Sequence, residues 1–366
     1  MMRRLIQTIE KSFLSLFFLF PHSSHALLTM PTMPPQQSTL ISFPLEDAYD
    51  ILPYTDHPQY KRLMALLEHI QQSIDMEQET TVPVFSLHPA SPHLSLLALR
   101  LKEWGFPLLD SSFPSVVAML KEFQKSHGLA QSGRLDPITL KTLNRPLKVL
   151  AQTLKKNQEK WEKLGGYHAN HVLINIPAFY LHVFKEAKIA LSCPVVVGKN
   201  KSKTPIFSAY ITSIVTHPIW MIPPSLVEKL KGNVGSKGYV WQEGRLIKLP
   251  GPHNDLGNLK FPVRDSHGIL LHGTKKPHYF QYAQRNKSHG CIRVRDTLPL
   301  ACELLPQKEK AIKAALDQKK TRTFTLPQEF PVYALYLTAW VTEKGMPRFY
   351  RDVYGMDQKH QEDEED

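Results

Sequence analysis

One of the three cysteines in this 366-residue chain lies among residues that could support covalent chemistry. Cys291 directly follows His289 and Gly290 in the stretch SHGC, and a second His-Gly pair, His272-Gly273, occurs earlier in GILLHGT. Thiolate is the nucleophilic form of cysteine, and a nearby imidazole can take the thiol proton. Gly290 lets the backbone turn tightly, and successive N–H groups there could bind a developing oxyanion. The stretch can therefore supply a nucleophile and an oxyanion hole, with His272 or His289 as the base.

Two other interpretations of Cys291 stay open from residue types alone. The simpler one is a buried, unreactive thiol. The other is a zinc site that uses His272, His289 and Cys291. His267 or His278 would complete such a site, but no C-x-x-C or H-E-x-x-H pattern accompanies these residues.

Residues 1–26 have the pattern of a secretory signal peptide. A basic start, MMRR, precedes the apolar run FLSLFFLF and the small-residue end SHA. The run is short for a membrane span, so a cleaved signal is predicted, with an uncleaved anchor or a mature helix as alternatives. Export implies an oxidising compartment, in which three cysteines cannot all pair within one chain. Cys193 and Cys302 have contexts typical of core residues, and a disulfide between them is a further alternative.

The overall composition is that of a globular protein with an excess of positive charge. Hydrophobic residues make up 42% and charged residues 21% of the chain, and its length suits two or three domains. The net charge of +12 favours an anionic partner such as nucleic acid, a membrane surface or an acidic polymer. The basic residues are scattered and no nucleic-acid-binding motif occurs, so nucleic acid is not predicted as a partner.

The first half of the chain predicts helices. Residues 27–92 predict a linker and scaffold segment with one helix. Residues 93–146 contain three short segments with apolar residues at helical spacing. In the third of these, Asp136 at the N-cap and Pro137 after it form a strong helix start. Residues 147–170 predict a Lys-rich helical connector with a solvated face.

The second half predicts an α+β domain over residues 171–357. Short β-branched and aromatic segments separated by turn residues predict a mostly antiparallel β core with flanking helices. Residues 219–260 interrupt this pattern with a Gly- and Pro-rich insertion, which we expect to form a mobile cap over Cys291. The end, residues 358–366, is an acidic tail.

The helical segment resembles a known domain. The stretch VVAMLKEFQKSHGLAQSGRLDPITLKTLN is similar to the peptidoglycan-binding-like helical domain, which runs helix, FQ…HGL, Gly loop and a last helix that ends in LN. Most matching positions are core and turn residues, so the resemblance supports the fold more than direct glycan binding. We expect this domain to position the wall polymer, and a chain that begins near Lys160 to keep the chemistry.

The cysteine stretch resembles the catalytic motif of the YkuD-type L,D-transpeptidases. In HGT…SHGCIRVRD, fifteen residues separate His272 from Ser288, which is within the spacing of that family. KTPIF, THPIWMIPPSL and LPGPHNDLGNLKF are similar to further family segments, although His217 stands where asparagine is usual. The C-terminal segment PVYALYLTAWVTEKGMPRFYRDVYGMD is similar to the YcbB-like subgroup, so the resemblance covers residues 93–357.

This resemblance implies a peptidoglycan L,D-transpeptidase. Cys291 would attack the carbonyl of the third residue of a stem tetrapeptide and release D-alanine, and a neighbouring diaminopimelate amine would then attack the thioester to form a 3–3 cross-link. His272 matches the catalytic base, which the carbonyl of Gly273 would orient. The amides of His289, Gly290 and Cys291 would form the oxyanion hole, and the His289 side chain would be structural support.

The resemblance also implies substrate contacts and partners. Arg293 would bind a substrate carboxylate, and Ser288, Trp220 and Tyr239 are further candidates for substrate binding. Peptidoglycan stem peptides are the expected partner and carbapenem-type inhibitors are candidate ligands, with neither a metal nor an organic cofactor. The expected location is the periplasm, in association with the cell wall, with membrane contact only through an uncleaved signal.

Other functions of the same chain stay open from its sequence. Water as the acceptor would give an L,D-carboxypeptidase, and a lipoprotein lysine as the acceptor would give a lipoprotein-attaching transpeptidase. The alternative outside the enzymes is a non-catalytic protein that binds the cell wall. The intact pair of Cys291 and His272 argues against that class, because a binding protein needs neither residue.

Overall fold

The computed structural model describes residues 51–266 and 268–359. The predicted signal peptide (1–26), the first part of the predicted linker (27–50), most of the acidic tail (360–366) and His267 lie outside the described residues. Within the described ranges, no helix is long and apolar enough to cross a membrane.

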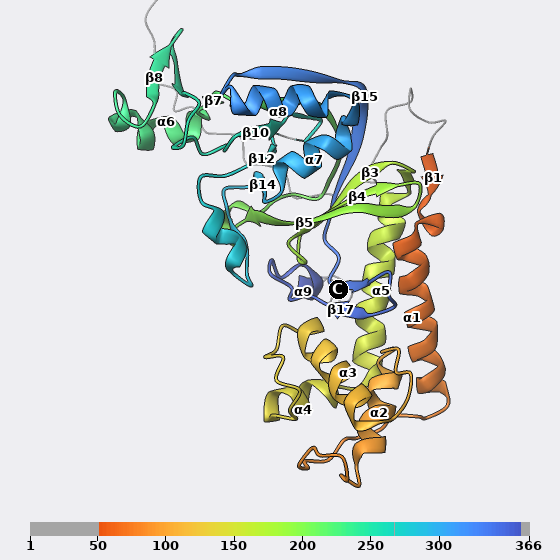
Figure 1. Cartoon of the computed structure of the whole chain (residues 1–366). Helices are drawn as coiled ribbons and strands as arrows, with labels where there is room; N and C mark the ends of the chain where they lie inside the picture. Colours follow the sequence, from red (N-terminus) through yellow and green to blue (C-terminus); the bar gives the residue numbers. More distant parts are fainter. Residues whose placement is uncertain (1–50, 267, 360–366) are drawn as a thin grey trace, which may run out of the picture. The chain divides into compact units, whose positions relative to one another are not determined.

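Helices form most of the first half and flank the sheet in the second (Figure 1). They are α1 (Pro58–Asp75), α2 (Leu94–Glu103), α3 (Phe113–Ser126), α4 (Pro137–Leu143), α5 (Leu147–Leu164), α6 (Pro224–Leu230), α7 (Thr297–Leu304), α8 (Glu309–Asp317) and α9 (Met356–Lys359).

Strands form one large sheet and three small ones. They are β1 (Ile51–Pro53), β2 (Gly166–His168), β3 (His171–Asn175), β4 (Tyr180–Lys185), β5 (Lys188–Gly198), β6 (Phe207–Thr216), β7 (Trp220–Met221), β8 (Tyr239–Gln242), β9 (Arg245–Lys248), β10 (Leu259–Phe261), β11 (Val263–Arg264), β12 (Leu271–His272), β13 (Asn286–Ser288), β14 (Ile292–Val294), β15 (Arg322–Leu335), β16 (Ala339–Val341) and β17 (Pro347–Phe349).

The large sheet closes on itself. Its order is β10-β12-β14-β5-β4-β3-β15-β6-β11, and β10 also pairs with β6, so the hydrogen-bonded strands form a ring. Most pairs are antiparallel, and β12–β14, β3–β15 and β5–β13 are parallel. The predicted α+β fold with a mostly antiparallel β core is confirmed.

One face of this sheet holds the core of the catalytic half. Alternate apolar side chains of the paired strands, such as Val195, Leu271 and Ile292, are buried together with Leu300 of α7 and Ile312 of α8. Because side chains alternate along a strand, the residues between these positions face the other side of the sheet. That opposite face carries the candidate site.

The three predicted helices of the helical segment are present as α2, α3 and α4. Trp104 at the end of α2 packs edge-on against Phe123 of α3, with ring centroids 5.2 Å apart. The Asp136 carboxylate accepts hydrogen bonds from the N–H groups of Ile138 and Thr139 at 3.0 and 2.9 Å, and so caps α4 as predicted.

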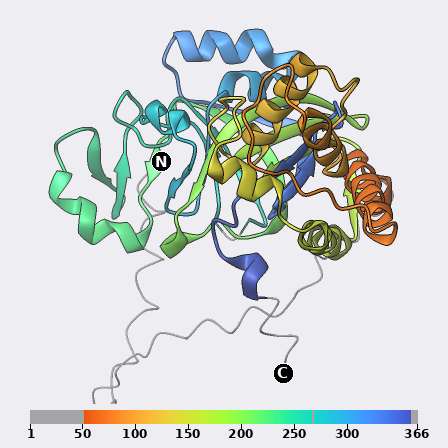
Figure 2. The ribbon, with the colours of Figure 1, turned by 90° about the horizontal axis from the view of Figure 1, so that it is seen from below.

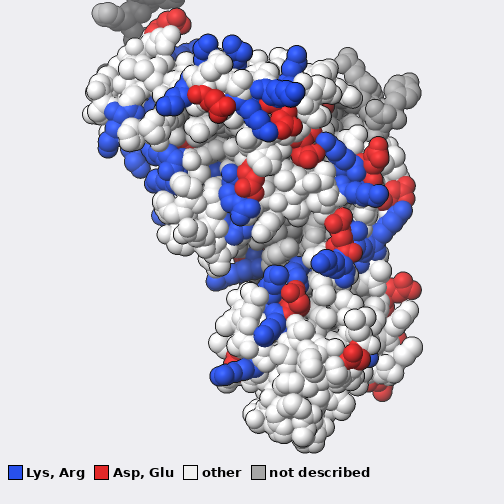
Figure 3. All heavy atoms as spheres, viewed as in Figure 1, with Lys and Arg blue, Asp and Glu red and all other residues white. Residues whose placement is uncertain are grey.

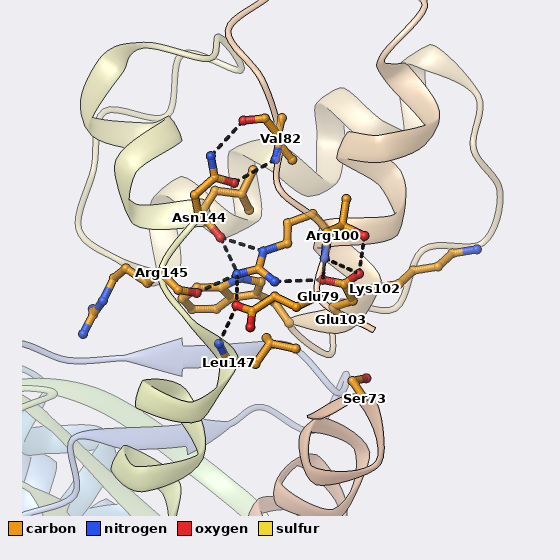
Figure 4. Close-up of polar contacts among 12 residues, drawn as sticks. Ser73, Glu79, Val82, Arg100, Lys102, Glu103, Asn144, Arg145 and Leu147 are labelled. Atoms are coloured by element: carbon orange, nitrogen blue, oxygen red, sulfur yellow. Dashed lines mark hydrogen bonds and ion pairs between the residues drawn. The ribbon is translucent and has the colours of Figure 1, made fainter. Parts of the chain in front are cut away.

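Arg100 is the polar centre of the junction between α2, α4 and α5 (Figure 4). Its side chain is 1% exposed and forms an ion pair with Glu103 at 2.8 Å. It donates to the carbonyls of Leu143 and Arg145 at 2.8 and 2.6 Å, and contacts Glu79 at 3.4 Å. One buried guanidinium therefore joins segments from three parts of the chain.

The connector differs from its prediction, because α5 is an amphipathic helix that is packed along one side. Leu150, Leu154 and Trp161 recur at helical spacing and are buried against α1. The two helices lie side by side in Figure 1 and Figure 2. The Lys-rich composition predicted only the exposed side, and the 3–4-residue spacing of the apolar residues was the signal for the buried one.

The helical segment and the sheet share one continuous core. It includes Leu63 of α1, Phe123 of α3 and Trp161 of α5, together with Leu335 of β15 and Trp340 of β16. A chain that begins near Lys160 would lose α1 and most of α5 and expose this part of the core. The expectation that such a chain keeps the chemistry is therefore revised, because removing a packed core face destabilises what remains.

A buried pair of histidines joins α1 to the sheet. His57 at the N-cap of α1 accepts a hydrogen bond from the N–H of Gln59 on Nδ1 at 3.1 Å, and its Nε2 lies 3.2 Å from Nε2 of His171 in β3. Nδ1 of His171 donates to the carbonyl of His168 at 2.7 Å. Two neutral rings satisfy all these contacts. An added proton on either ring would place two N–H donors face to face, with no acceptor between them.

We expect this pair to make the fold sensitive to acid. Burial lowers the pKa of both histidines, to about 2 for His57 and about 3 for His171, and the charge of the His171 ring lowers that of His57 further. Between their folded pKa values and 6.5, the unfolded chain binds more protons, so stability is lost as the pH falls below 6.5. The loss is about 1.4 kcal/mol per pH unit for each histidine.

Urea denaturation at several values between pH 7 and pH 5 measures this effect. A His171→Gln variant should show a flatter dependence of unfolding free energy on pH than the wild-type chain. Equal slopes in the two proteins would show that the pair does not titrate in this way.

Candidate active site

Cys291 lies at a tight turn between two strands that both pair with β5. The chain runs along β5 as β13, turns at His289 and Gly290, and returns as β14. Gly290 has φ +116°, its N–H donates to Ser288 Oγ at 3.1 Å, and its carbonyl accepts from Thr204 Oγ1 at 2.7 Å. The peptide groups on both sides of Gly290 are therefore fixed, and so is the position of the half-buried cysteine that follows.

Replacing Gly290 with alanine should displace Cys291. The φ of +116° lies in a region that favours glycine, and an added Cβ would lie 3.4 Å from Ile269. We expect a loss of about 1–3 kcal/mol in stability and a larger loss in the reactivity of Cys291. Thermal unfolding and the rate of thiol alkylation measure the two effects, with Gly268→Ala as the control.

Gly268 also has a positive φ, of +82°, but no atom lies within 4 Å of its added Cβ. Both variants should lose stability, and only Gly290→Ala should change the alkylation rate of Cys291. Equal alkylation rates in the two variants would contradict the proposed role of the turn.

His272 lies on the strand next to the one that follows Cys291. It ends β12, which pairs with β14 in the register Leu271 to Ile292 and His272 to Arg293. The His272 ring is 5% exposed, and its Nδ1 donates to the carbonyl of Gly273 at 2.5 Å. This contact leaves Nε2 as the nitrogen that can accept a proton. The predicted orienting contact between Gly273 and His272 is thus present in the geometry.

The electrostatic surroundings favour neutral forms of both groups. Burial lowers the pKa of His272 to about 4, and the positive charge of Arg293 contributes. Burial raises the pKa of the Cys291 thiol, against the opposing effects of the Leu270 N–H and of Arg293. Arg293 acts electrostatically on both groups. At neutral pH these shifts favour a thiol on Cys291 and a neutral imidazole on His272.

Two other predicted residues have structural contacts. Ser288 is 1% exposed, and its Oγ accepts from the Gly290 N–H, so it stabilises the turn. That bond also engages one of the three amides predicted for the oxyanion hole. His289 is exposed, with Nε2 3.4 Å from Nζ of Lys199. Substrate binding by Ser288 stays a prediction, as does the oxyanion role of the three amides.

Arg293 is the predicted residue with unused hydrogen-bonding capacity. It is partly buried, and its guanidinium lies 5.6 Å from the ring centroid of Tyr279. Among the described residues, its Nε and Nη1 atoms are buried and have no hydrogen-bond partner. Buried guanidinium donors without partners favour an anionic ligand at this position.

The insertion has a small core of its own. It forms a three-stranded sheet, β7-β9-β8, over α6, and its buried residues are Ile222, Tyr239 and Leu246. Tyr239 is 5% exposed, and its hydroxyl accepts from Nζ of Lys248 at 3.1 Å, while Trp220 is partly buried beside this core. Core packing explains both aromatic residues, and their contact with substrate stays a prediction.

The predicted end of the insertion differs from the structure. Leu259 and Lys260 fall inside the predicted range 219–260, but they form β10 of the main sheet, between β6 and β12. The insertion proper therefore ends before Leu259. The LKF segment is too short to have a recognisable strand pattern, so only its pairing shows where it belongs.

The three cysteines are unpaired. Cys193 is buried in the core as predicted, and Cys302 in α7 is only half-buried, so the disulfide alternative is not adopted. Within residues 51–266 and 268–359, no group of three or more His, Cys, Asp and Glu side chains is placed to hold a metal ion. His267, one alternative zinc ligand, is outside these ranges.

A cleft of about 590 Å³ opens beside Gly273, at the ends of β12 and β14. Its walls include Asn254 and Gly257 from the segment before β10, Phe280 from the segment after β12, and Arg295. Cys291 is not part of its lining. The cleft therefore borders Gly273, whose carbonyl orients His272.

Comparisons with known proteins identify two matching family models. Residues 169–306 match the family model described as the L,D-transpeptidase catalytic domain, named YkuD. Residues 94–143 match the model described as "Putative peptidoglycan binding domain". Residues 169–306 are thus similar to L,D-transpeptidase catalytic domains. They include every candidate catalytic residue, and the second match covers α2 to α4.

Similar proteins are known from several bacteria. A "Putative L,D-transpeptidase" of Haemophilus influenzae is 28% identical over 241 residues, which are 57% of this chain and 49% of that protein. The chain thus spans about half the length of the curated relative it matches. The YcbB-like subgroup stays a prediction.

Solved L,D-transpeptidases are also similar. A crystal structure from Stackebrandtia nassauensis is 14% identical, with a TM-score of 0.28, and the match covers 70% of this chain and 95% of that one. The catalytic domain from Enterococcus faecium, acylated by ertapenem, is 15% identical with a TM-score of 0.27 over 46% of this chain and 98% of that one.

Proposed function

We propose that this chain is a cysteine-dependent acyltransferase, a peptidoglycan L,D-transpeptidase that forms 3–3 cross-links. The observation that carries the proposal is His272. It is held by the carbonyl of Gly273 on the strand beside the Cys291 turn, and all three residues lie within the matched catalytic domain. The helical segment and the net charge of +12 both suit a polymer with many carboxylates.

The first half of the reaction forms a thioester. Nε2 of His272 takes the thiol proton as the sulfur of Cys291 attacks the carbonyl carbon of the third stem residue. The carbon–sulfur bond forms and the negative charge moves to the carbonyl oxygen, where backbone N–H groups of the turn stabilise it. When the oxyanion collapses, the carbon–nitrogen bond breaks, and His272 returns the proton to the leaving D-alanine amine.

The second half transfers the acyl group to an amine. The side-chain amine of a neighbouring diaminopimelate attacks the thioester and gives a proton to His272. The carbon–sulfur bond then breaks, and the thiolate of Cys291 regains that proton. Two stem peptides are joined and the enzyme returns to its starting state without a metal or an organic cofactor.

Muropeptide analysis tests the proposal. Purified protein with tetrapeptide stems should release D-alanine and give cross-linked dimers that mass spectrometry identifies as 3–3 linked. Tripeptide without dimer would identify an L,D-carboxypeptidase, and transfer to a lysine of an added lipoprotein would identify an attaching enzyme. Sacculus binding without D-alanine release would identify a binding protein. A carbapenem should add its mass to the wild-type chain at Cys291.

We also propose that the protein acts in the periplasm, on the cell wall, and that the insertion closes over the site. Closure would exclude water and favour transfer to an amine over hydrolysis. Hydrogen exchange of residues 219–258 should slow in the acyl-enzyme. Shortening the insertion should raise the ratio of tripeptide to dimer. Unchanged exchange together with a constant product ratio would identify the insertion as a static part of the domain.

A further inference from the structure

Three basic side chains lie in a row across the sheet at the candidate site. Lys260 of β10 is the register partner of His272 in β12, and His272 is the register partner of Arg293 in β14. Directly paired residues of neighbouring strands direct their side chains to the same face. The row continues into Val215 of β6 on one side and Val196 of β5 on the other. His272 therefore has a cation on each side and no carboxylate in its row.

Within residues 51–266 and 268–359, neither cation has an anionic partner. Lys260 is half-buried, and burial lowers its pKa. In the described part of the chain, no hydrogen bond or ion pair is formed by its Nζ. Arg293 has two buried guanidinium atoms without a partner in the same part of the chain. Burying a cation without an anion is unfavourable, so this arrangement suits a site that is completed by a ligand.

The carboxylate that acts electrostatically on the site already has cationic partners. Asp255 acts electrostatically on His272 and Arg293, but it forms ion pairs with Lys248 at 2.8 Å and Lys275 at 2.9 Å. Lys and Arg side chains also predominate around the insertion on the face shown in Figure 3. An excess of positive charge therefore surrounds the site.

We propose that Lys260 and Arg293 form a carboxylate-binding subsite on either side of His272, with Lys260 as a positioning residue for the substrate. The proposal rests on the function proposed above. Their Cα atoms are two strands apart, about 10 Å, so both long side chains can reach one carboxylate between them. Bound there, the carboxylate would hold the acyl donor beside Cys291 and complete the charge balance of the site.

Two carboxylates of the substrate have the required chemistry. One is the C-terminal carboxylate of the leaving D-alanine, and the other is the free carboxylate of the diaminopimelate side chain. Both are a few bonds from the carbonyl that Cys291 attacks. The subsite would select stems that keep the carboxylate it binds and reject stems in which that group is amidated.

The first test needs no transpeptidase activity. Iodoacetate and iodoacetamide alkylate thiols and differ in one negative charge, so the ratio of their rates at Cys291 reports the local cations. Peptide mapping separates Cys291 from the other two thiols. Lys260→Met should lower the ratio about tenfold, and Lys260→Arg should preserve it. Lys260→Gln is the second neutral variant, in case the methionine disturbs folding.

Lys188→Met is the matched control. Lys188 is exposed at the start of β5, eight positions (196 − 188) along that strand from Val196, or roughly 26 Å. Lys188→Met removes the same charge as Lys260→Met and should leave the ratio of the two alkylation rates unchanged. A ratio that is equal in Lys260→Met, Lys260→Gln and wild type would overturn the subsite.

The second test identifies the carboxylate. With an unmodified tetrapeptide stem, Lys260→Met should raise KM about tenfold and change kcat less. The variant and wild type should have equal KM for a stem in which the bound carboxylate is amidated. If the two KM values are equal for the stem with an amidated C-terminus, the subsite binds the D-alanine carboxylate. If they are equal for the stem with an amidated diaminopimelate, it binds the side-chain carboxylate. A full Lys260 effect with both amides would contradict the proposal. If wild type releases no D-alanine but the alkylation ratio falls as expected, the proposed function fails and the anion subsite stands.

Discussion

Replacing Cys291 with alanine is expected to abolish D-alanine release and cross-linking, with a loss of at least about 10³-fold. No other group of the site can form the acyl-enzyme, because His272 is buried and acts only on protons in the proposed reaction. Cys291 is half-buried and sits at the end of a turn that its neighbours hold. The variant should therefore fold, with an unchanged thermal unfolding temperature.

Cys302→Ala is the matched control for this prediction. Cys302 is a half-buried thiol in α7, outside the candidate site. Its variant should keep full activity, and a carbapenem should still add its mass to that protein but not to Cys291→Ala. Activity that survives in Cys291→Ala and is lost in Cys302→Ala would overturn the assignment of the nucleophile.

Replacing Arg100 with methionine should produce the largest loss of stability. The substitution leaves the Glu103 carboxylate, in a residue that is 4% exposed, without its ion-pair partner. It also removes the donors to the carbonyls of Leu143 and Arg145. Breaking a buried ion pair by removing one partner costs about 3–5 kcal/mol. Urea denaturation monitored by circular dichroism measures the change in unfolding free energy.

Lys102→Met removes the same charge from an exposed position of α2 and should change the unfolding free energy by less than about 0.5 kcal/mol. Arg100→Met/Glu103→Gln should recover part of the loss, since the neutral amide is less costly to bury. Equal stability of the Arg100 and Lys102 variants would contradict the role of Arg100 at the junction.

The sequence by itself predicted the features that depend on local patterns. Asp136 and Pro137 predicted the start of α4, because the capping bonds form within one helical turn. Cys291 and His272 were identified as candidates by residue type and spacing. The change from helical to alternating periodicity also predicted an α+β domain from residue 171, where β3 begins.

Only the tertiary structure determined the features that depend on contacts between distant segments. Lys260 falls within the predicted insertion, and only the pairing of β10 places it beside His272, because a three-residue strand carries no periodicity of its own. Three other features each join residues far apart in the chain. They are the buried side of α5, the pair of His57 and His171, and the junction at Arg100. Their burial and their pKa values are set by neighbours that local sequence does not specify. The sequence thus determined which groups are available for chemistry, whereas the register of β10, β12 and β14 determined which of them stand together.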